Sequence, residues 1–200
     1  MPSNARGSQF ILLLVAAGFL ALGSIQGGRI TKMREIERFY RWALTAATFY
    51  LGARIGLLLV VPGTNVGIFW PPAGLALGLM LRWGPRIWPG VALGAAVALG
   101  PEQLRDHGLL LGGAVTLGEV VADVLPVLLA TRWIGRALAG ADPLARTPDL
   151  LKVVLLGGLL AQGLAAAMGL SVIWLSDDLP ASLLPSAGLN WWFSNLVSVC

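Results

Sequence analysis

The sequence predicts an all-α polytopic integral membrane protein, a bundle of about five to seven transmembrane helices. Hydrophobic residues make up 56% of the 200 residues and charged residues only 12%. The mean hydropathy is +0.78, whereas roughly a quarter of the residues of a soluble domain are charged. The Lys and Arg residues lie between apolar runs instead of forming one basic stripe, so the net charge of +4 indicates membrane orientation and not nucleic-acid binding.

Five apolar segments are predicted as membrane helices, and a sixth begins near the end of the chain. A span needs about 20 apolar residues, so the second and third segments are short and are expected to recruit flanking residues or to pack inside the bundle. About ten residues remain from the start of the sixth segment, so the fold is expected to be incomplete at its C-terminus. The segments are 42–61, 68–81, 87–100, 108–130 and 151–175, and the sixth begins at Trp191.

Basic residues assign the segments between helices to the two sides of the membrane. Lys and Arg in short loops mark the cytoplasmic side, and alternate crossings place ten of them on one side and one on the other. The opposite loops are PGTNVG, PEQLRDH and SDDLPASLLPSAGLN. We therefore expect a multi-pass membrane protein with this orientation. The ten are Lys32, Arg34, Arg38, Arg41, Arg82, Arg86, Arg132, Arg136, Arg146 and Lys152.

The first 32 residues allow three interpretations. They contain Arg6 followed by an apolar run of about 16 residues, the pattern of a signal peptide or an extra membrane helix. The third interpretation is that Met33 is the true start of the protein. The predicted domain organisation is an N-terminal hydrophobic segment over residues 1–32 and a membrane domain over residues 33–200.

Three ionisable residues lie inside predicted spans, where charges are costly and often functional: Arg54, Glu119 and Asp123. Glu119 and Asp123 are one helical turn apart on the same face. Arg54 and Glu119 are each about 20 Å from the cytoplasmic boundary if their segments are helical. We hypothesise that the three form a ligand site or a switchable ion pair. A static pair that fixes the register of the helices is the alternative of equal weight.

The segment FWPPAGLALGLMLRWGPRIWPG predicts a compact helical hairpin. Pro71, Pro72 and Pro89 fall in the first turns of its two helices, where the backbone N–H groups have no intrahelical partner and proline costs little. Small residues four positions apart predict close approach of neighbouring helices in lipid. These pairs are Gly52/Gly56, Gly74/Gly78, Gly90/Gly94 and Ala165/Gly169.

Catalytic and metal-binding patterns are absent from the sequence. It contains no GxSxG, HExxH, P-loop or CxxC motif. Its single cysteine, Cys200, and single histidine, His107, are too few for a zinc or haem site within one chain. We therefore expect no enzymatic activity, no cofactor and no metal for this chain.

Two sequence patterns carry a family resemblance. The first is W-P-x-x-G-[IL]-A followed, after a glycine and a basic residue, by W-P-G; the second is WWFSNLVSV. Together they resemble the bacterial membrane-associated sensor domain of the first type, in which Arg54 matches a commonly basic position. The family has Gly-Asp where this chain has Ser194-Asn195. The matching residues of the first pattern are Trp70, Pro71, Gly74, Leu75, Ala76, Trp88, Pro89 and Gly90.

The resemblance implies a sensory input domain of sensor histidine kinases and diguanylate cyclases, and hence signal transduction of the two-component type. It also implies a multi-pass location in the bacterial plasma (inner) membrane. It implies a fused cytoplasmic kinase or cyclase domain, which is absent from these 200 residues. The expected partners are the lipid bilayer, an unknown small ligand and a second copy of the chain. The alternative function is a small membrane transporter or the substrate-binding subunit of one, but transporter helices break near the membrane midplane, whereas Pro71 and Pro72 lie near the outer end.

Overall fold

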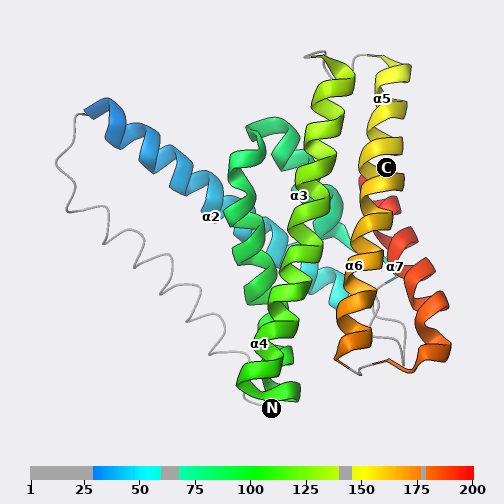
Figure 1. The fold of residues 1–200 in the computed structure, drawn as a ribbon. Helices are drawn as coiled ribbons and strands as arrows, with labels where there is room; N and C mark the ends of the chain where they lie inside the picture. Colours follow the sequence, from blue (N-terminus) through cyan, green and yellow to red (C-terminus); the bar gives the residue numbers. More distant parts are fainter. Residues whose placement is uncertain (1–28, 60–67, 140–145, 177–178) are drawn as a thin grey trace.

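The computed structural model describes residues 29–59, 68–139, 146–176 and 179–200, with only the backbone for 29–32. Within these ranges the chain is all α-helical with no strand, which confirms the predicted fold class at that level (Figure 1). The elements in chain order are α2 (Arg29–Leu57), α3 (Pro71–Trp83), the 3₁₀ turn η2 (Pro85–Ile87), α4 (Trp88–Leu138), α5 (Thr147–Val153), the π-helix η3 (Val154–Leu160), α6 (Ala161–Leu175), the 3₁₀ turn η4 (Ala181–Leu183) and α7 (Leu184–Val199).

Helix α4 is a hairpin of two antiparallel helical arms. The chain reverses at Gly108, whose φ of 76° and ψ of −178° are non-helical and accessible essentially only to glycine. The arms, residues 88–107 and 109–138, run in opposite directions. The second arm rises in Figure 1 from green at the bottom to lime at the top. The segment PEQLRDH was predicted as a loop, and this is wrong: it is helical up to the reversal, because one glycine is enough to turn the chain.

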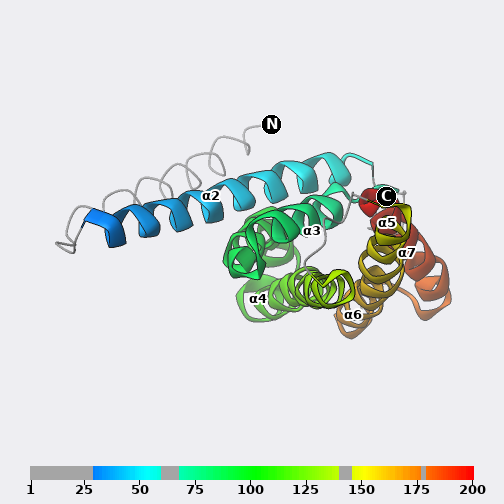
Figure 2. The same cartoon turned by 90° about the horizontal axis from the view of Figure 1, so that it is seen from above.

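Glycines bring α2 close to the first arm of α4. A Cβ on Gly94 would lie 2.7 Å from the carbonyl oxygen of Ala46, and a Cβ on Gly90 would lie 2.6 Å from that of Trp42. The Trp42 indole also donates a hydrogen bond of 3.0 Å to the Arg86 carbonyl in η2. The N-terminal part of α2 projects away from the rest of the bundle (Figures 1 and 2). The predicted glycine packing is therefore present at this contact.

The C-terminal half of the chain packs against the hairpin. Elements α5, η3 and α6 form one continuous rod beside the second arm of α4, and α7 runs back along α6 to reach α3 (Figure 2). Helix α7 begins at Leu184, so the predicted outer segment SDDLPASLLPSAGLN is helical in its second half. Of the other predicted outer segments, PGTNVG lies outside the described residues. The domain boundary proposed at Met33 falls within α2.

Two helical stretches in the described part of the chain are long and apolar enough to cross a membrane. They are Pro85–Leu138, which contains the reversal at Gly108, and Thr147–Leu175. Each arm of the hairpin is at least about 30 Å long, which matches the hydrocarbon thickness of a bilayer. Helix α3, with 13 residues, is shorter. The total of five to seven transmembrane helices stays a prediction.

Candidate ligand or switch site

The three ionisable residues singled out from the sequence do not form one cluster. Arg54 is exposed on α2 and, among the described residues, makes no ion pair with Glu119 or Asp123. It lies two residues before Gly56, which contacts the side chain of Trp70, and Asp123 interacts with the same side chain. Residues two positions apart in a helix point in directions about 200° apart around its axis, so Arg54 faces away from the bundle when Gly56 faces inward.

Glu119 lies inside the α4 hairpin and faces its other arm. Its side chain is 9% exposed, and its Oε1 accepts a hydrogen bond of 2.8 Å from Gln103 Nε2. The backbones of the two arms approach closely here, because a Cβ on Gly112 would overlap the Gln103 carbonyl oxygen. The Gln103–Glu119 bond therefore fixes the register of the two arms, which is the structural role weighed in the sequence analysis, but with glutamine in place of Arg54.

Asp123, one turn further along, faces α3 instead. Its carboxylate interacts with the indole of Trp70, the residue before the first turn of α3. The indole Nε1–H is buried and has no partner at full hydrogen-bonding geometry among the described residues. The contact thus joins an acid in the fourth predicted span to the tryptophan of the W-P-x-x-G pattern. An incompletely satisfied buried donor next to a carboxylate is unusual in a folded protein.

Trp70 is held in place from two further sides. On α2, a Cβ at Gly56 would lie 2.6 Å from Trp70 Cε3, so only a glycine leaves room for the ring. On α7, the Ser194 carbonyl accepts a hydrogen bond of 3.4 Å from the Trp70 backbone N–H. The ring and the backbone of Trp70 therefore connect α2, α4 and α7.

Helix α7 is bound to the first turn of α3 by a second polar contact. Ser198 Oγ accepts a hydrogen bond of 3.2 Å from the Gly74 backbone N–H and donates one of 2.6 Å to the Asn195 carbonyl. The helices touch here, because a Cβ on Gly74 would overlap the Ser198 carbonyl. Asn195 is 1% exposed, and its Oδ1 has no hydrogen-bond partner among the described residues. The two segments that carry the family resemblance are thus in direct contact.

The other residues of the first pattern have structural positions. Pro71 and Pro89 occupy the first turns of α3 and α4, as predicted. Gly90 contacts α2, and Trp88 is 48% exposed on the surface. Gly78, predicted as a packing residue, has nothing within 4 Å of an added Cβ and faces outward.

Chemically, the Trp70–Asp123 contact and Asn195 provide a carboxylate, an incompletely satisfied N–H donor and an amide oxygen without a partner among the described residues. Such groups bind small polar ligands or exchange partners when helices shift, because buried polar atoms gain energy from each hydrogen bond they complete. Among the described residues no group of three or more His, Cys, Asp or Glu side chains is arranged to hold a metal ion. Sequence reasoning missed the Trp70–Asp123 contact. Trp70 stood out for its place in the family pattern and Asp123 as an ionisable residue in a predicted span, but no sequence signal paired them.

Comparison with known proteins identifies the family. The MASE1 family model matches residues 42–199, which covers every element from the middle of α2 to the end of α7. No curated protein and no solved structure matches the chain significantly. MASE1 domains are membrane sensor domains of signal-transduction proteins. The match over more than three quarters of the sequence shows that this chain belongs to the MASE1 family of membrane-associated sensory input domains.

Proposed function

We propose that this chain is a sensory input domain that crosses the bacterial inner membrane several times and passes a signal to a cytoplasmic kinase or diguanylate cyclase domain. Family membership supports the sensory role, and MASE1 domains occur in sensor kinases and cyclases. It also favours a sensor over the alternative of a membrane transporter. The observation that carries the mechanism is the contact between Trp70 and Asp123 beside the attachment of α7.

In this proposal a small ligand, or a change of helix packing, alters the partners of Asp123 and Trp70. Trp70 and Gly74 bind α7 through Ser194 and Ser198, so a displacement of Trp70 changes the position of α7. A ligand shifts such an equilibrium by its difference in affinity for the two arrangements. Arg54 and Glu119 remain candidate switch residues, with Arg54 exposed and Glu119 bonded to Gln103 in the arrangement described here.

The test is a fusion of the full 200-residue chain, through its C-terminus, to a diguanylate cyclase domain, with cyclic di-GMP measured in cells. Asp123→Asn and Trp70→Phe each remove one polar group of the contact and are expected to change the output at least about fivefold, the lower end of typical coupling between sites. The matched controls are Glu102→Gln and Trp174→Phe, both exposed. They should leave the output unchanged.

The amount of each fusion in the membrane is measured by immunoblot, so that loss of protein is not read as loss of signal. Output from both contact variants equal to wild type, at equal membrane amounts, would refute the proposed site. A fused cyclase whose output is also indifferent to removal of the whole membrane domain would refute the sensory role itself.

A further inference from the structure

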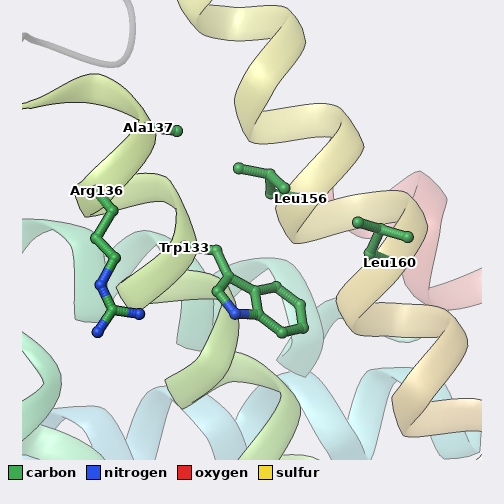
Figure 3. Close-up of a pocket in the computed structure, with 5 residues that line it drawn as sticks. All are labelled: Trp133, Arg136, Ala137, Leu156 and Leu160. Carbon is green, nitrogen blue, oxygen red and sulfur yellow. The ribbon is translucent and has the colours of Figure 1, made fainter.

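A shallow groove lies between the last turns of α4 and the π-helix η3. Its volume is ≈ 510 Å³, and it is lined by Trp133, Arg136 and Ala137 of α4 and by Leu156 and Leu160 of η3. Figure 3 shows the Trp133 indole extending toward Leu160 and Leu156 pointing toward α4, whereas the Arg136 side chain runs along the side of α4 that is turned away from η3. The groove is separate from the candidate ligand site, because none of Trp70, Asp123 or Asn195 lines it.

One wall of the groove is the π-helix η3. Its two glycines face the bundle interior: a Cβ on Gly157 would lie 2.6 Å from Leu77 Cδ2, and a Cβ on Gly158 would lie 2.7 Å from Leu196 Cδ1. The buried amide of Gln162 donates a hydrogen bond of 3.1 Å to the Gly157 carbonyl, which stabilises the widened turn. With the interior face of η3 fixed in this way, Leu156 and Leu160 are left beside the small side chain of Ala137. Single-turn π-helices are frequent at functional sites.

We propose that this groove binds one anionic phospholipid of the cytoplasmic leaflet, with an acyl chain against Trp133, Leu156 and Leu160 and the phosphate at Arg136. The lining fits this ligand because it is apolar except for Arg136, whose long and exposed side chain can turn toward a phosphate at the mouth of the groove. Arg136 is exposed and has no ion pair among the described residues, so its charge is available. Arg132, one turn earlier on α4, is also exposed and adds positive potential.

The position of the groove distinguishes a lipid from other occupants. It lies at the end of α4 where basic residues predict the cytoplasmic surface, and basic pockets between membrane helices on that side bind anionic head groups. The neighbouring side chains of Leu155, Leu159 and Leu160 are exposed, which is the surface expected against acyl chains. Lys152 is engaged with Asp149 and the Ala137 carbonyl, which leaves Arg136 as the cation of the groove itself.

Native mass spectrometry of the full chain in mild detergent tests the proposal. Phosphatidylglycerol and phosphatidylcholine with identical acyl chains are added separately, and the fraction of protein with one lipid bound is measured. One phosphatidylglycerol should be retained with about fivefold higher affinity than phosphatidylcholine, as expected for one basic side chain near an anionic head group. Arg136→Gln should abolish this preference, and Arg86→Gln, an exposed cation outside the groove, should preserve it.

A second variant tests the groove independently of charge. Ala137→Leu fills the space between α4 and η3 and should lower retention of both lipids, whereas Ala114→Leu, on an exposed position of the same helix, should not. Thermal unfolding of each variant verifies its fold. Excess inorganic phosphate should fail to displace phosphatidylglycerol.

Three results would overturn the lipid site: equal retention of the two lipids by the wild type, an unchanged preference in Arg136→Gln, or displacement by phosphate alone. Dimers that disappear in Ala137→Leu while lipid retention is unaffected would assign the groove to a second copy of the chain. These readouts do not depend on any signalling output, so they stand apart from the test of the sensory role.

Discussion

Two contacts of the bundle differ in what holds them. Between α2 and α4, Gly90 and Gly94 meet backbone atoms of α2 directly. The buried Thr45 beside Gly90 donates its hydroxyl to the Arg41 carbonyl of its own helix, so no polar atom of the described residues links the two helices there. Where α3 meets α4 and α7, the contact is polar: Trp70 interacts with Asp123 and donates its backbone N–H to the Ser194 carbonyl. Two buried polar atoms in this region, Trp70 Nε1 and Asn195 Oδ1, lack a full hydrogen-bond partner among the described residues.

This difference between the two contacts indicates which one serves stable packing and which one can change its partners. A backbone-to-backbone contact has no alternative arrangement without loss of its close packing, since lipid supplies no hydrophobic drive to re-form it. A polar contact with unused donors and acceptors can gain hydrogen bonds from a ligand or from a shifted helix. The α2–α4 contact is therefore expected to dominate stability, and the α3–α4–α7 contact to dominate the response.

The largest expected effect is at the glycine contact. Gly94→Val places a branched side chain where even a Cβ lies 2.7 Å from the Ala46 carbonyl oxygen. Overpacking costs about 1–3 kcal/mol, and we expect the upper end here because the contact is with backbone that must move. Thermal unfolding in detergent measures the loss. Gly78→Val is the matched control, because an added Cβ there meets nothing within 4 Å. If both variants unfold at the same temperature, the glycine contact does not carry the stability.

A satisfied polar contact should show an intermediate effect. Gln103→Leu leaves Glu119 Oε1 without its 2.8 Å donor inside the hairpin, and loss of one partner of a buried hydrogen bond costs about 1–3 kcal/mol. The free energy of unfolding, measured in the same detergent, is compared with that of Glu102→Leu, an exposed position on the same arm. A stability equal to the control would show that the hairpin does not need this bond.

The smallest stability effect is expected at the incompletely satisfied contact. Asn195→Leu replaces a buried amide whose Oδ1 has no partner among the described residues, so the change in unfolding free energy should stay within about 1 kcal/mol. The exposed Asn190→Leu serves as the control. In the cyclase fusion the same variant should alter the output. A large loss of stability would instead make Asn195 part of the packing core.

Much of the fold follows from composition that is local in the sequence. Apolar runs, prolines at helix starts and glycines at four-residue spacing predicted helices in nearly the places where α2, α3, α4 and α6 lie. These signals are local because a helix satisfies its backbone within its own segment, as a membrane requires. The W-P-x-x-G and WWFSNLVSV segments were likewise enough to indicate the family that the MASE1 match confirms.

The candidate site was only partly predictable. The sequence singled out Glu119 and Asp123 as ionisable residues of a predicted span; Glu119 is buried within the hairpin, and Asp123 lies beside Trp70. Their partners were not predicted: Gln103 takes the place next to Glu119, and Trp70 the place next to Asp123. Distance along a helix follows from residue counting, but the rotation of each helix about its axis depends on all its neighbours.

By itself, the sequence determined that this protein is helical, that it belongs in a membrane and that it is a sensory input domain, because hydropathy and motif residues act within one segment. Only the tertiary structure decided that the chain reverses at Gly108, that Arg54 faces outward and that Trp70 joins Asp123 to α7. Each of these depends on contacts between residues far apart in the chain, which are selected when the helices pack together and not when each helix forms.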